Sequence, residues 1–267
     1  MSAESTVAWR PDVEGIAEVF RAHFEEHAYP MHTHDVWTLL TVDRGRIGYE
    51  LGGERCDSTT RSVTLLPPHV AHDGHSLTAG GFDKRVIYLE SRMLTGVGRA
   101  VGRPTLLDGP LRRRVDRLNS ALTAPGEEFE AASRLALILE RLQWHLDGNP
   151  QAPEMPRNRS VAHAFRDLLD GRIREGMTLA EAGRALYVDP THLVREFSRE
   201  FGLPPHRYLI GRRVELARGM LLAGGAPAEV SVEAGFHDQS HLNRHFKSMV
   251  GTTPGRYARS GGTAARR

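Results

Sequence analysis

Apolar positions recur at helical spacing near the end of the chain. After Asp238, which can cap a helix through its carboxylate, Leu242 and Phe246 are followed by Met249 and Val250, so that one face of the helix is apolar. The opposite face carries amide, imidazole, hydroxyl and cationic groups, which are the side chains that contact bases and phosphates in a DNA major groove. By itself, this pattern is equally typical of a solvated surface helix.

A second helical pattern lies directly before the first. Residues 226–236 read as a helix in which Pro227 occupies the first turn and Gly235 supplies the left-handed residue that lets the chain reverse. A helix, a tight turn at glycine and a second helix with a polar face together describe a helix-turn-helix.

The same arrangement occurs twice in the chain. A shift of 49 residues aligns 178–208 with 227–257, and 10 of the 31 aligned positions are identical. In the first copy these positions are Ala185, Asp189, His192, Leu193, Arg195, Phe197, Gly202, Pro205, Arg207 and Tyr208. We therefore expect two helix-turn-helix units in tandem, the first opened by a capping box of Thr178 with Glu181.

Residues 205–222, between the two units, read as one continuous helix about 27 Å long. A connecting helix of this length can hold two recognition helices close to one turn of DNA apart, which is about 34 Å.

Region 160–259 resembles the AraC/XylS-type transcriptional regulators. The resemblance rests on HLVREFSREFG, PPHRYLIGRRVELARGMLL and GFHDQSHLNRHFKSMVGTTPGRYAR, and it covers both units in order. The first unit departs from the second in having Tyr187-Val188 at its turn, and Ser231 stands where the family usually has alanine.

The outward polar face of each recognition helix, together with this resemblance, implies double-stranded DNA as a partner. The residues expected to contact DNA are Thr191, His192, Val194, Arg195 and Arg199 in the first unit and Gln239, Ser240, His241, Asn243, Arg244 and Lys247 in the second. Arginine reads guanine, glutamine or asparagine reads adenine, and Val194 would contact a thymine methyl group. Phe197 and Phe246 are expected in the core.

The first third of the chain has short strand patterns instead. Strand-like runs occupy 37–42, 46–51, 54–58, 62–67 and 85–90, and Gly52-Gly53 marks a hairpin turn. Strands of this length and spacing suggest a small barrel or sandwich. The expected fold class is α+β, with an N-terminal barrel, two helices, and an all-α C-terminal domain.

Histidines cluster in this strand region, in PMHTHD and PPHVAHDGH. Their placement resembles the cupin pattern and the N-terminal sensor domain that accompanies the regulator family. Three imidazoles, from His32, His34 and His72, could hold Zn²⁺ or Fe²⁺, but the carboxylate position of metal-binding cupins is Thr38 or Leu39. We therefore expect no bound metal or cofactor, and instead imidazoles that hydrogen-bond within the barrel mouth or line an organic-ligand site.

The barrel interior is the natural place for a small-molecule effector. The candidate lining residues are Trp9, His32, His34, Trp37, Arg46, Tyr49 and His72. Trp9 would act from an N-terminal arm, although it is equally typical of ordinary core.

Two apolar helical stripes follow the strands. They consist of Leu111, Val115, Leu118 and Leu122, and of Leu135, Ile138, Leu139, Leu142 and Leu146. By resemblance these helices form the dimerisation element, although they could simply pack on the barrel. The expected organisation is a barrel with its arm at 1–103, helices for dimerisation at 104–147, a Pro-rich linker at 148–159, the DNA-binding domain at 160–259 and a disordered tail at 260–267.

Charge separates the two halves of the chain. Residues 157–267 carry a net charge of +7, whereas the remainder carries −5. A basic C-terminal domain behind an acidic N-terminal one fits nucleic-acid binding by the former only. The single cysteine, Cys56, excludes a disulfide scaffold, and no apolar run is long enough for a membrane span or a signal peptide, so we expect a cytoplasmic protein.

These patterns predict a sequence-specific transcriptional regulator, not an enzyme, that acts as a homodimer under control of a small molecule, with RNA polymerase as a candidate partner. Two alternatives remain open. The first is a cupin metalloenzyme fused to a DNA-binding domain, and the second is a ligand-independent regulator whose barrel only dimerises. The sequence does not identify the effector, the operator, the target genes or the sign of regulation.

Overall fold

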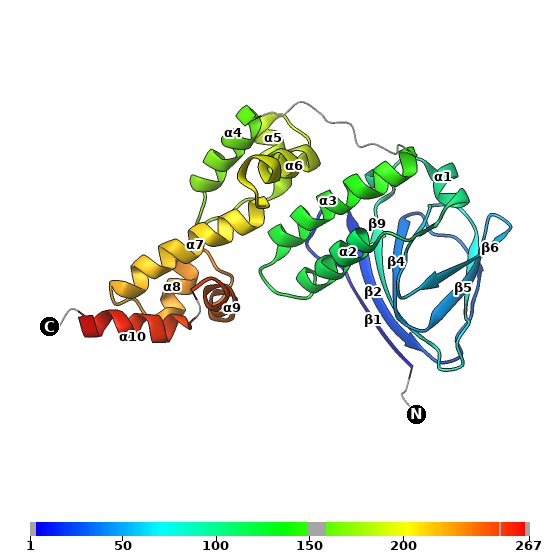
Figure 1. The fold of residues 1–267 in the computed structure, drawn as a ribbon, viewed down its shortest axis with the longest axis horizontal. Helices are drawn as coiled ribbons and strands as arrows, with labels where there is room; N and C mark the ends of the chain where they lie inside the picture. Colours follow the sequence, from blue (N-terminus) through cyan, green and yellow to red (C-terminus); the bar gives the residue numbers. More distant parts are fainter. Residues whose placement is uncertain (1–3, 149–158, 251, 265–267) are drawn as a thin grey trace. The chain divides into compact units, whose positions relative to one another are not determined.

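The computed structural model describes residues 4–148, 159–250 and 252–264 (Figure 1). The chain divides into two compact units, the first made of residues 1–119 and 138–153 and the second of residues 120–137 and 154–267. Strands lie only in the first unit among the described residues, and the fold class is α+β, as predicted. None of the helices in the described residues is both long and apolar enough to cross a membrane.

Two antiparallel sheets, joined by one buried apolar cluster, form the β part of the first unit, which is called the barrel from here on. The larger has the strand order β1-β2-β9-β4-β7-β10, and the smaller has the order β3-β8-β5-β6. The strands are β1 (Ser5–Trp9), β2 (Ile16–Phe24), β3 (Tyr29–His32), β4 (Trp37–Arg44), β5 (Arg46–Leu51), β6 (Glu54–Thr59), β7 (Val63–Leu66), β8 (His72–Ser76), β9 (Phe82–Leu89) and β10 (Thr105–Leu106).

All five predicted strands are present, and β1, β2, β3, β8 and β10 were missed. Strand β8 has the sequence HDGHS, which contains no apolar residue, so its place in the sheet comes from pairing with β3 and β5 instead of from a local pattern. Alternation along β4 and β9 places Leu40, Val42 and Val86 in one buried cluster together with residues of β2 and β5.

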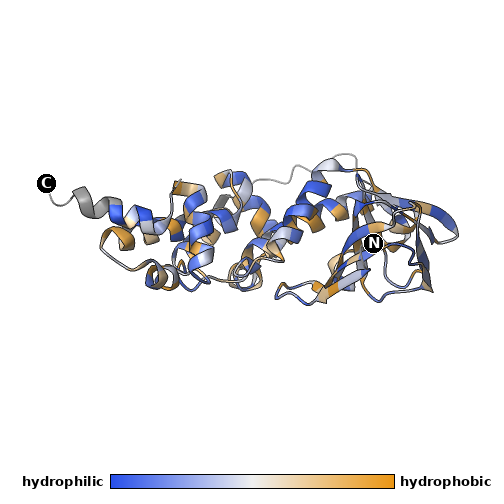
Figure 2. Ribbon diagram, turned by 90° about the horizontal axis from the view of Figure 1, so that it is seen from below, coloured by the Kyte–Doolittle hydropathy of each residue, from blue (hydrophilic) through white to orange (hydrophobic). Residues whose placement is uncertain are grey.

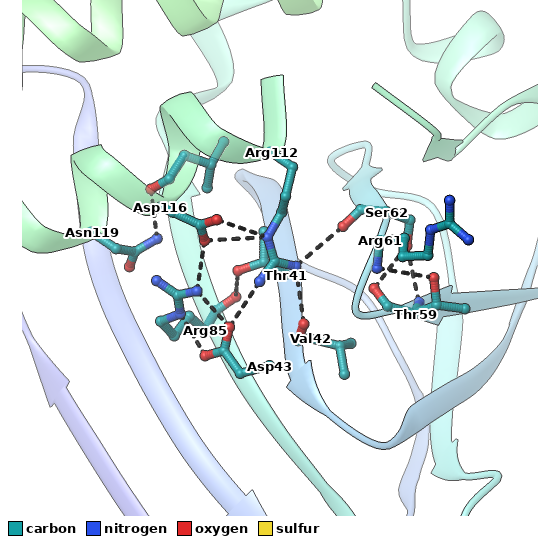
Figure 3. Close-up of polar contacts among 11 residues, drawn as sticks. Thr41, Val42, Asp43, Thr59, Arg61, Ser62, Arg85, Arg112, Asp116 and Asn119 are labelled. Atoms are coloured by element: carbon teal, nitrogen blue, oxygen red, sulfur yellow. Dashed lines mark hydrogen bonds and ion pairs between the residues drawn. The ribbon is translucent and has the colours of Figure 1, made fainter. Parts of the chain in front are cut away.

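Two helices follow the strands, α2 (Gly109–Ala121) and α3 (Glu128–Asp147), after the short helices η1 (Ser91–Met93) and α1 (Val97–Gly102). Arg112 on α2 fixes this helix to the larger sheet, because its guanidinium donates to the Val42 carbonyl at 2.9 Å and to the Asp43 carboxylate at 2.8 Å (Figure 3). Arg85 of β9 links Asp43 to Asp116 on the same helix. These charge-assisted contacts hold α2 on the outer face of the sheet.

The apolar stripes predicted to support dimerisation are buried within this chain. Leu111, Val115 and Leu118 of α2 are at most 1% exposed, and Ile138 and Leu142 of α3 are fully buried. A dimer of this protein would therefore need a surface other than these stripes.

The second unit is helical. Its elements are α4 (Arg159–Asp170), α5 (Leu179–Leu186), α6 (Pro190–Phe201), α7 (Pro205–Leu222), α8 (Pro227–Glu233), α9 (Gln239–Val250) and α10 (Pro254–Ala264). Each longer helix carries hydrophilic and hydrophobic residues along its length (Figure 2), and the apolar ones gather in two clusters. One cluster includes Phe165, Leu193 and Phe197, and the other includes Leu242 and Phe246.

The local signals for the helix-turn-helix units are confirmed. Thr178 and Glu181 form a capping box, α7 has the bounds expected from the sequence, and Gly235 has a left-handed φ of 85°. At the turn of the first helix-turn-helix, after α5, Tyr187 takes the left-handed conformation at φ 54°, which is unusual for a residue with a side chain. This is the turn at which the sequence of the first helix-turn-helix differs from that of the second.

The predicted linker falls largely on residues 149–158, which lie outside the described residues. The predicted tail at 260–267 begins within α10, which ends at Ala264, and residues 265–267 lie outside the described residues. The segment Ser120–Leu137 belongs to the second unit, although the sequence placed it with the helices of the first half.

Candidate functional site

Helix α6 is held by a cap at its start and by apolar residues along one face. The carboxylate of Asp189 accepts hydrogen bonds from the backbone N–H groups of Thr191 at 2.8 Å and His192 at 3.2 Å. Leu193 and Phe197 are fully buried. Thr191 and His192 are half-buried and lie at the exposed N-terminal end of the helix.

Val194 is also fully buried, in the cluster with Phe165 and Phe197. The prediction that it contacts a thymine methyl group is therefore wrong for this conformation, because the side chain is covered by the unit's own core. A valine three residues before Phe197 fits either reading of the helical pattern, and only packing distinguishes them.

Arg195 and Arg199 share one buried carboxylate on their own helix. Glu196 is 2% exposed, and its Oε1 accepts hydrogen bonds from Arg195 Nε at 3.3 Å and from Arg199 Nη1 at 3.2 Å. His192 also contacts the Arg195 guanidinium. These contacts orient two cations that stay partly exposed, which reduces the entropy that an arginine loses when it binds.

Helix α9 repeats the design of α6. Asp238 accepts the backbone N–H of His241 at 2.7 Å, and Leu242 and Phe246 are fully buried. The polar face is accessible, because four of the predicted DNA contacts are exposed and Asn243 is half-buried. The four exposed residues are Gln239, Ser240, Arg244 and Lys247.

His241 does not belong to that polar face, since it is 3% exposed. Its Nδ1 accepts the backbone N–H of His237 at 3.2 Å, so the ring proton is on Nε2, which lies 3.7 Å from Glu127 Oε1. Burial, followed by the neighbouring His245 and Arg244, lowers the pKa of His241 to about 4. The predicted DNA contact is therefore corrected to a buried neutral imidazole.

Glu127 is an unexpected partner of α9. Its Oε1 accepts hydrogen bonds from Arg244 Nη2 at 2.6 Å and from His245 Nε2 at 2.8 Å, and the residue is 6% exposed. Glu127, His241 and His245 are close enough to share a metal ion. However, the proton on His241 Nε2 points to a hydrogen-bonded cluster, because a metal ligand would need a lone pair there.

The three predicted histidines of the first unit do come together. Ring centroids are 4.6 Å apart for His32 and His72, 4.9 Å for His32 and His34, and 5.3 Å for His34 and His72. His32 Nδ1 donates to the Pro30 carbonyl at 2.7 Å, and His72 Nδ1 donates to Val70 at 3.0 Å. Both rings therefore keep an Nε2 lone pair for a ligand.

This tautomer fits metal coordination, and the three imidazoles offer ligand atoms within 4.8 Å of one another. Burial, followed by the neighbouring His72 and His32, lowers the pKa of His34 to about 4, and burial also lowers the pKa of His72. Neutral imidazoles at neutral pH can serve either a metal ion or a hydrogen-bonding organic ligand. The donor set fits both.

The other predicted effector residues do not join this cluster. Trp37 is fully buried, and its indole N–H donates to the Ser91 carbonyl at 3.2 Å. The hydroxyl of Tyr49 forms a hydrogen bond with the Thr105 hydroxyl at 2.8 Å. Arg46 pairs with Asp57 at the exposed surface, and Trp9 lies on the edge strand β1.

Three residues that the sequence analysis missed lie with the histidines. Tyr88 contacts the His34 ring at a centroid distance of 5.1 Å, Tyr29 lies 6.0 Å from the His32 ring, and Lys84 lies over the Tyr29 ring at 4.0 Å. The signal was available, because alternation along β9 places Lys84 and Tyr88 on the face of the buried Val86.

Comparisons with known proteins agree with both halves of this description. Residues 15–139 match the family described as the AraC-like ligand binding domain, and residues 182–260 match a helix-turn-helix domain family. The chain is 33% identical over 111 residues to the transcriptional activator RhrA of Rhizobium meliloti, an alignment that covers 40% of this chain and 34% of RhrA. The chain thus spans about a third of the length of that relative.

Two further proteins are similar over most of their length. The uncharacterized HTH-type transcriptional regulator YbfI of Bacillus subtilis is 21% identical over 234 residues, which is 84% of this chain and 85% of YbfI. The crystal structure of the AraC-like transcriptional activator CuxR is 14% identical, covers 81% of each chain and has a TM-score of 0.45.

Proposed function

Because the chain belongs to the AraC family of transcriptional regulators, with an AraC-like ligand-binding domain ahead of its helix-turn-helix domain, we propose that it reads specific DNA sites through α6 and α9 under control of a small molecule in the barrel. The observation that carries the proposal is the paired design of the two helices. Each begins at an aspartate cap, buries leucine and phenylalanine on one face, and presents cations on the other.

Base contacts come from the accessible positions of these helices, which are exposed or half-buried. Arg195 and Arg244 suit guanine, which accepts two parallel hydrogen bonds from a guanidinium, and Gln239 suits adenine. Thr191 and Ser240 have hydroxyl groups at the same position of the two units. His192, Arg199, Asn243 and Lys247 are placed to contact phosphates, which fixes the position of the helices without reading sequence.

Helix α7 sets the separation of the two contacts. At 18 residues it is about 27 Å long, which is close to the roughly 34 Å between successive major-groove faces. One protomer therefore engages adjacent turns of a duplex.

The effector site lies at His32, His34 and His72. Imidazoles with free lone pairs next to apolar barrel residues match the composition of small-molecule sites, which are mostly apolar with a few convergent polar groups. The same donor set favours a metal ion as a second candidate occupant, and elemental analysis of the purified protein decides between the two.

Genome-wide mapping of bound DNA, followed by titration of the purified protein onto the recovered sites at fixed salt, tests the DNA-binding part. We expect recovered sites to bind at least 1,000-fold more tightly than random competitor DNA, as is typical of specific regulators. Equal affinity for recovered and random duplexes would contradict the proposal.

A further inference from the structure

Lys84 is a lysine on the inner face of the barrel. It lies on β9, in the middle of the larger sheet, where its cross-strand neighbours are Ala22 on β2 and Val42 on β4. Both neighbours belong to the buried apolar cluster. The ammonium lies 4.0 Å from the centre of the Tyr29 ring and 5.5 Å from that of Phe20.

The charge of Lys84 has no counter-charge. No carboxylate pairs with its ammonium within the part of the chain that the structure describes, and burial alone lowers its pKa to about 8. A lysine in apolar surroundings destabilises the fold unless a ligand or a partner group compensates for its lost hydration. Cation–π contacts with two rings offset only part of that cost.

Two buried hydroxyl groups also lack partners, one in contact with Lys84 and one farther along the same face of the larger sheet. The Tyr29 hydroxyl and Thr38 Oγ1 are buried and form no hydrogen bond among the described residues. Thr38 pairs in register with Tyr88, so it shares the inner face with the ring that contacts His34. Buried polar groups are nearly always hydrogen-bonded, and an exception at a binding site indicates a missing partner.

Four carboxylates influence the neighbours of Lys84, namely Glu4 at Tyr29, Glu18 at Tyr88, Asp35 at His34 and Asp73 at His72, but none forms an ion pair with the ammonium among the described residues. Lys84 is one of the charges that lower the pKa of His34 and of His72, so it acts on the same region as the imidazoles. His32 and His34 are half-buried, whereas His72 is 4% exposed. The site therefore offers one cation, hydroxyl donors and aromatic walls.

We propose that the barrel binds a small organic monocarboxylate with an apolar body, whose carboxylate lies between the Lys84 ammonium and the Tyr29 hydroxyl. This rests on the proposed role of the barrel as the effector-binding part. The apolar body would lie along Phe20, Leu40 and Val86, and the imidazoles and Thr38 would bind any further polar group of the ligand. A carboxylate supplies the missing charge and accepts the missing hydrogen bond at once.

The test uses the full-length protein without DNA and a panel of hexanoate, octanoate, benzoate and phenylacetate, each paired with its neutral amide. Binding is measured by calorimetry and by the shift in thermal unfolding. We expect at least one carboxylate to bind at least tenfold more tightly than its amide. Amides that bind as well as the carboxylates, or a panel without any binding, would overturn the proposal.

Variants locate the carboxylate. Lys84→Met should weaken binding at least tenfold and Tyr29→Phe several-fold, and the second change removes only an unpartnered hydroxyl, so the fold should persist. Arg55→Met, which removes a cation from the exposed surface of the same barrel, should leave binding unchanged. Equal weakening by Arg55→Met would show that net charge, not Lys84, is responsible.

Two further measurements distinguish carboxylate binding at Lys84 from metal binding at the histidines and from DNA binding. Carboxylate binding should survive EDTA, and binding that is lost with EDTA and restored by Zn²⁺ would move the anion to the histidines and overturn the role of Lys84. Specific DNA binding is measured on the same preparations. Intact DNA binding without any carboxylate binding would leave the proposed DNA-reading function standing and remove this inference alone.

Discussion

Arg244 donates a hydrogen bond to Glu127 Oε1 across 2.6 Å, so the cation proposed to read a base on α9 is already bound by a carboxylate of the protein. His245 donates to the same oxygen at 2.8 Å. Both contacts lie within the second unit. If Arg244 reads a base as proposed, DNA must compete with Glu127 for it, and the carboxylate would reduce the affinity of this conformation for DNA.

We predict that Glu127→Gln increases specific DNA affinity about three- to tenfold. The amide keeps the shape of the side chain, but a hydrogen bond to a neutral acceptor is roughly half as strong as one to a carboxylate, a difference of about 1 kcal/mol. Titration of an operator fragment at fixed salt measures the effect. Glu128→Gln, at the exposed neighbouring residue, makes the same change in charge, and an equal gain from it would assign the effect to net charge instead.

Arg195→Ala should weaken specific binding by about 1–3 kcal/mol and relax base choice at one position of the operator. Competition with operators carrying single base changes measures this selectivity. Arg199→Ala should weaken binding to all duplexes about equally and lower the salt slope by about 1, as expected for a phosphate contact. A uniform loss for Arg195→Ala would make it a phosphate contact too.

Val194→Ala should reduce the free energy of unfolding by about 1–3 kcal/mol and leave the DNA affinity of the folded protein unchanged, because the side chain is fully buried. Denaturation followed by helical circular dichroism, together with DNA titration below the transition, measures both quantities. Thr191→Ala, on the accessible side of the same helix, should weaken DNA binding and leave the free energy of unfolding nearly unchanged. Lost base selectivity with unchanged stability in Val194→Ala would restore the original base-contact prediction.

The DNA-binding half was largely predictable because its signals are local. Caps such as Asp189, the apolar spacing before Phe246 and the turn at Gly235 each act over a few residues, and the tandem repeat checks one copy against the other. What escaped prediction depends on contacts between distant residues. No local pattern around Glu127 predicts its contact with Arg244, 117 residues away.

The barrel was harder for the same reason. His32, His34 and His72 were predictable because they fall in two short histidine-rich segments, whereas Trp37 and Tyr49 rested on residue type alone, which does not indicate the face on which a side chain lies. A shift of one residue in strand register decides whether a side chain faces the interior or the solvent. Lys84 was overlooked because a lysine in a short strand is usually solvated.

The pH dependence of stability tests the burial of Lys84. Its pKa is about 8 in the folded protein and 10.5 in its ordinary state, so both states are protonated at pH 7 and the penalty of burying the charge is complete there. As pH rises from about 8 to 10.5 the unfolded chain binds more protons, and the penalty disappears. Over this range Tyr29 and Tyr88 stay neutral because burial raises the pKa of both hydroxyls, and His34 and His72 are already neutral because burial lowers the pKa of both imidazoles.

Lys84→Met should therefore raise the free energy of unfolding at pH 7 by on the order of 2 kcal/mol, with a gain that shrinks toward pH 10. Tryptophan fluorescence suits this measurement, since Trp9, Trp37 and Trp144 all lie in the first unit. A loss of stability at pH 7, or a gain independent of pH, would contradict an uncompensated buried ammonium.

Gly219→Ala should stabilise the second unit by about 0.5–1 kcal/mol, because glycine weakens a helix interior and a Cβ at this position meets no atom within 4 Å. Thermal unfolding measures the gain. Gly183→Ala is the control with the opposite expected effect. A Cβ there would lie 2.9 Å from the Val188 carbonyl oxygen, so the substitution should destabilise the second unit. Stabilisation by both substitutions would mean that the turn after α5 is looser than described.

Helix α7 runs unbroken from Pro205 to Leu222 and joins both helix-turn-helix units. A continuous helix cannot stretch, so we expect only one helical phase to be tolerated between the two short sequence elements that α6 and α9 are proposed to recognise. Adding half a helical turn of base pairs between those elements places the second on the far side of the duplex. Natural target promoters should therefore vary in sequence far more than in the number of base pairs that separates the two elements.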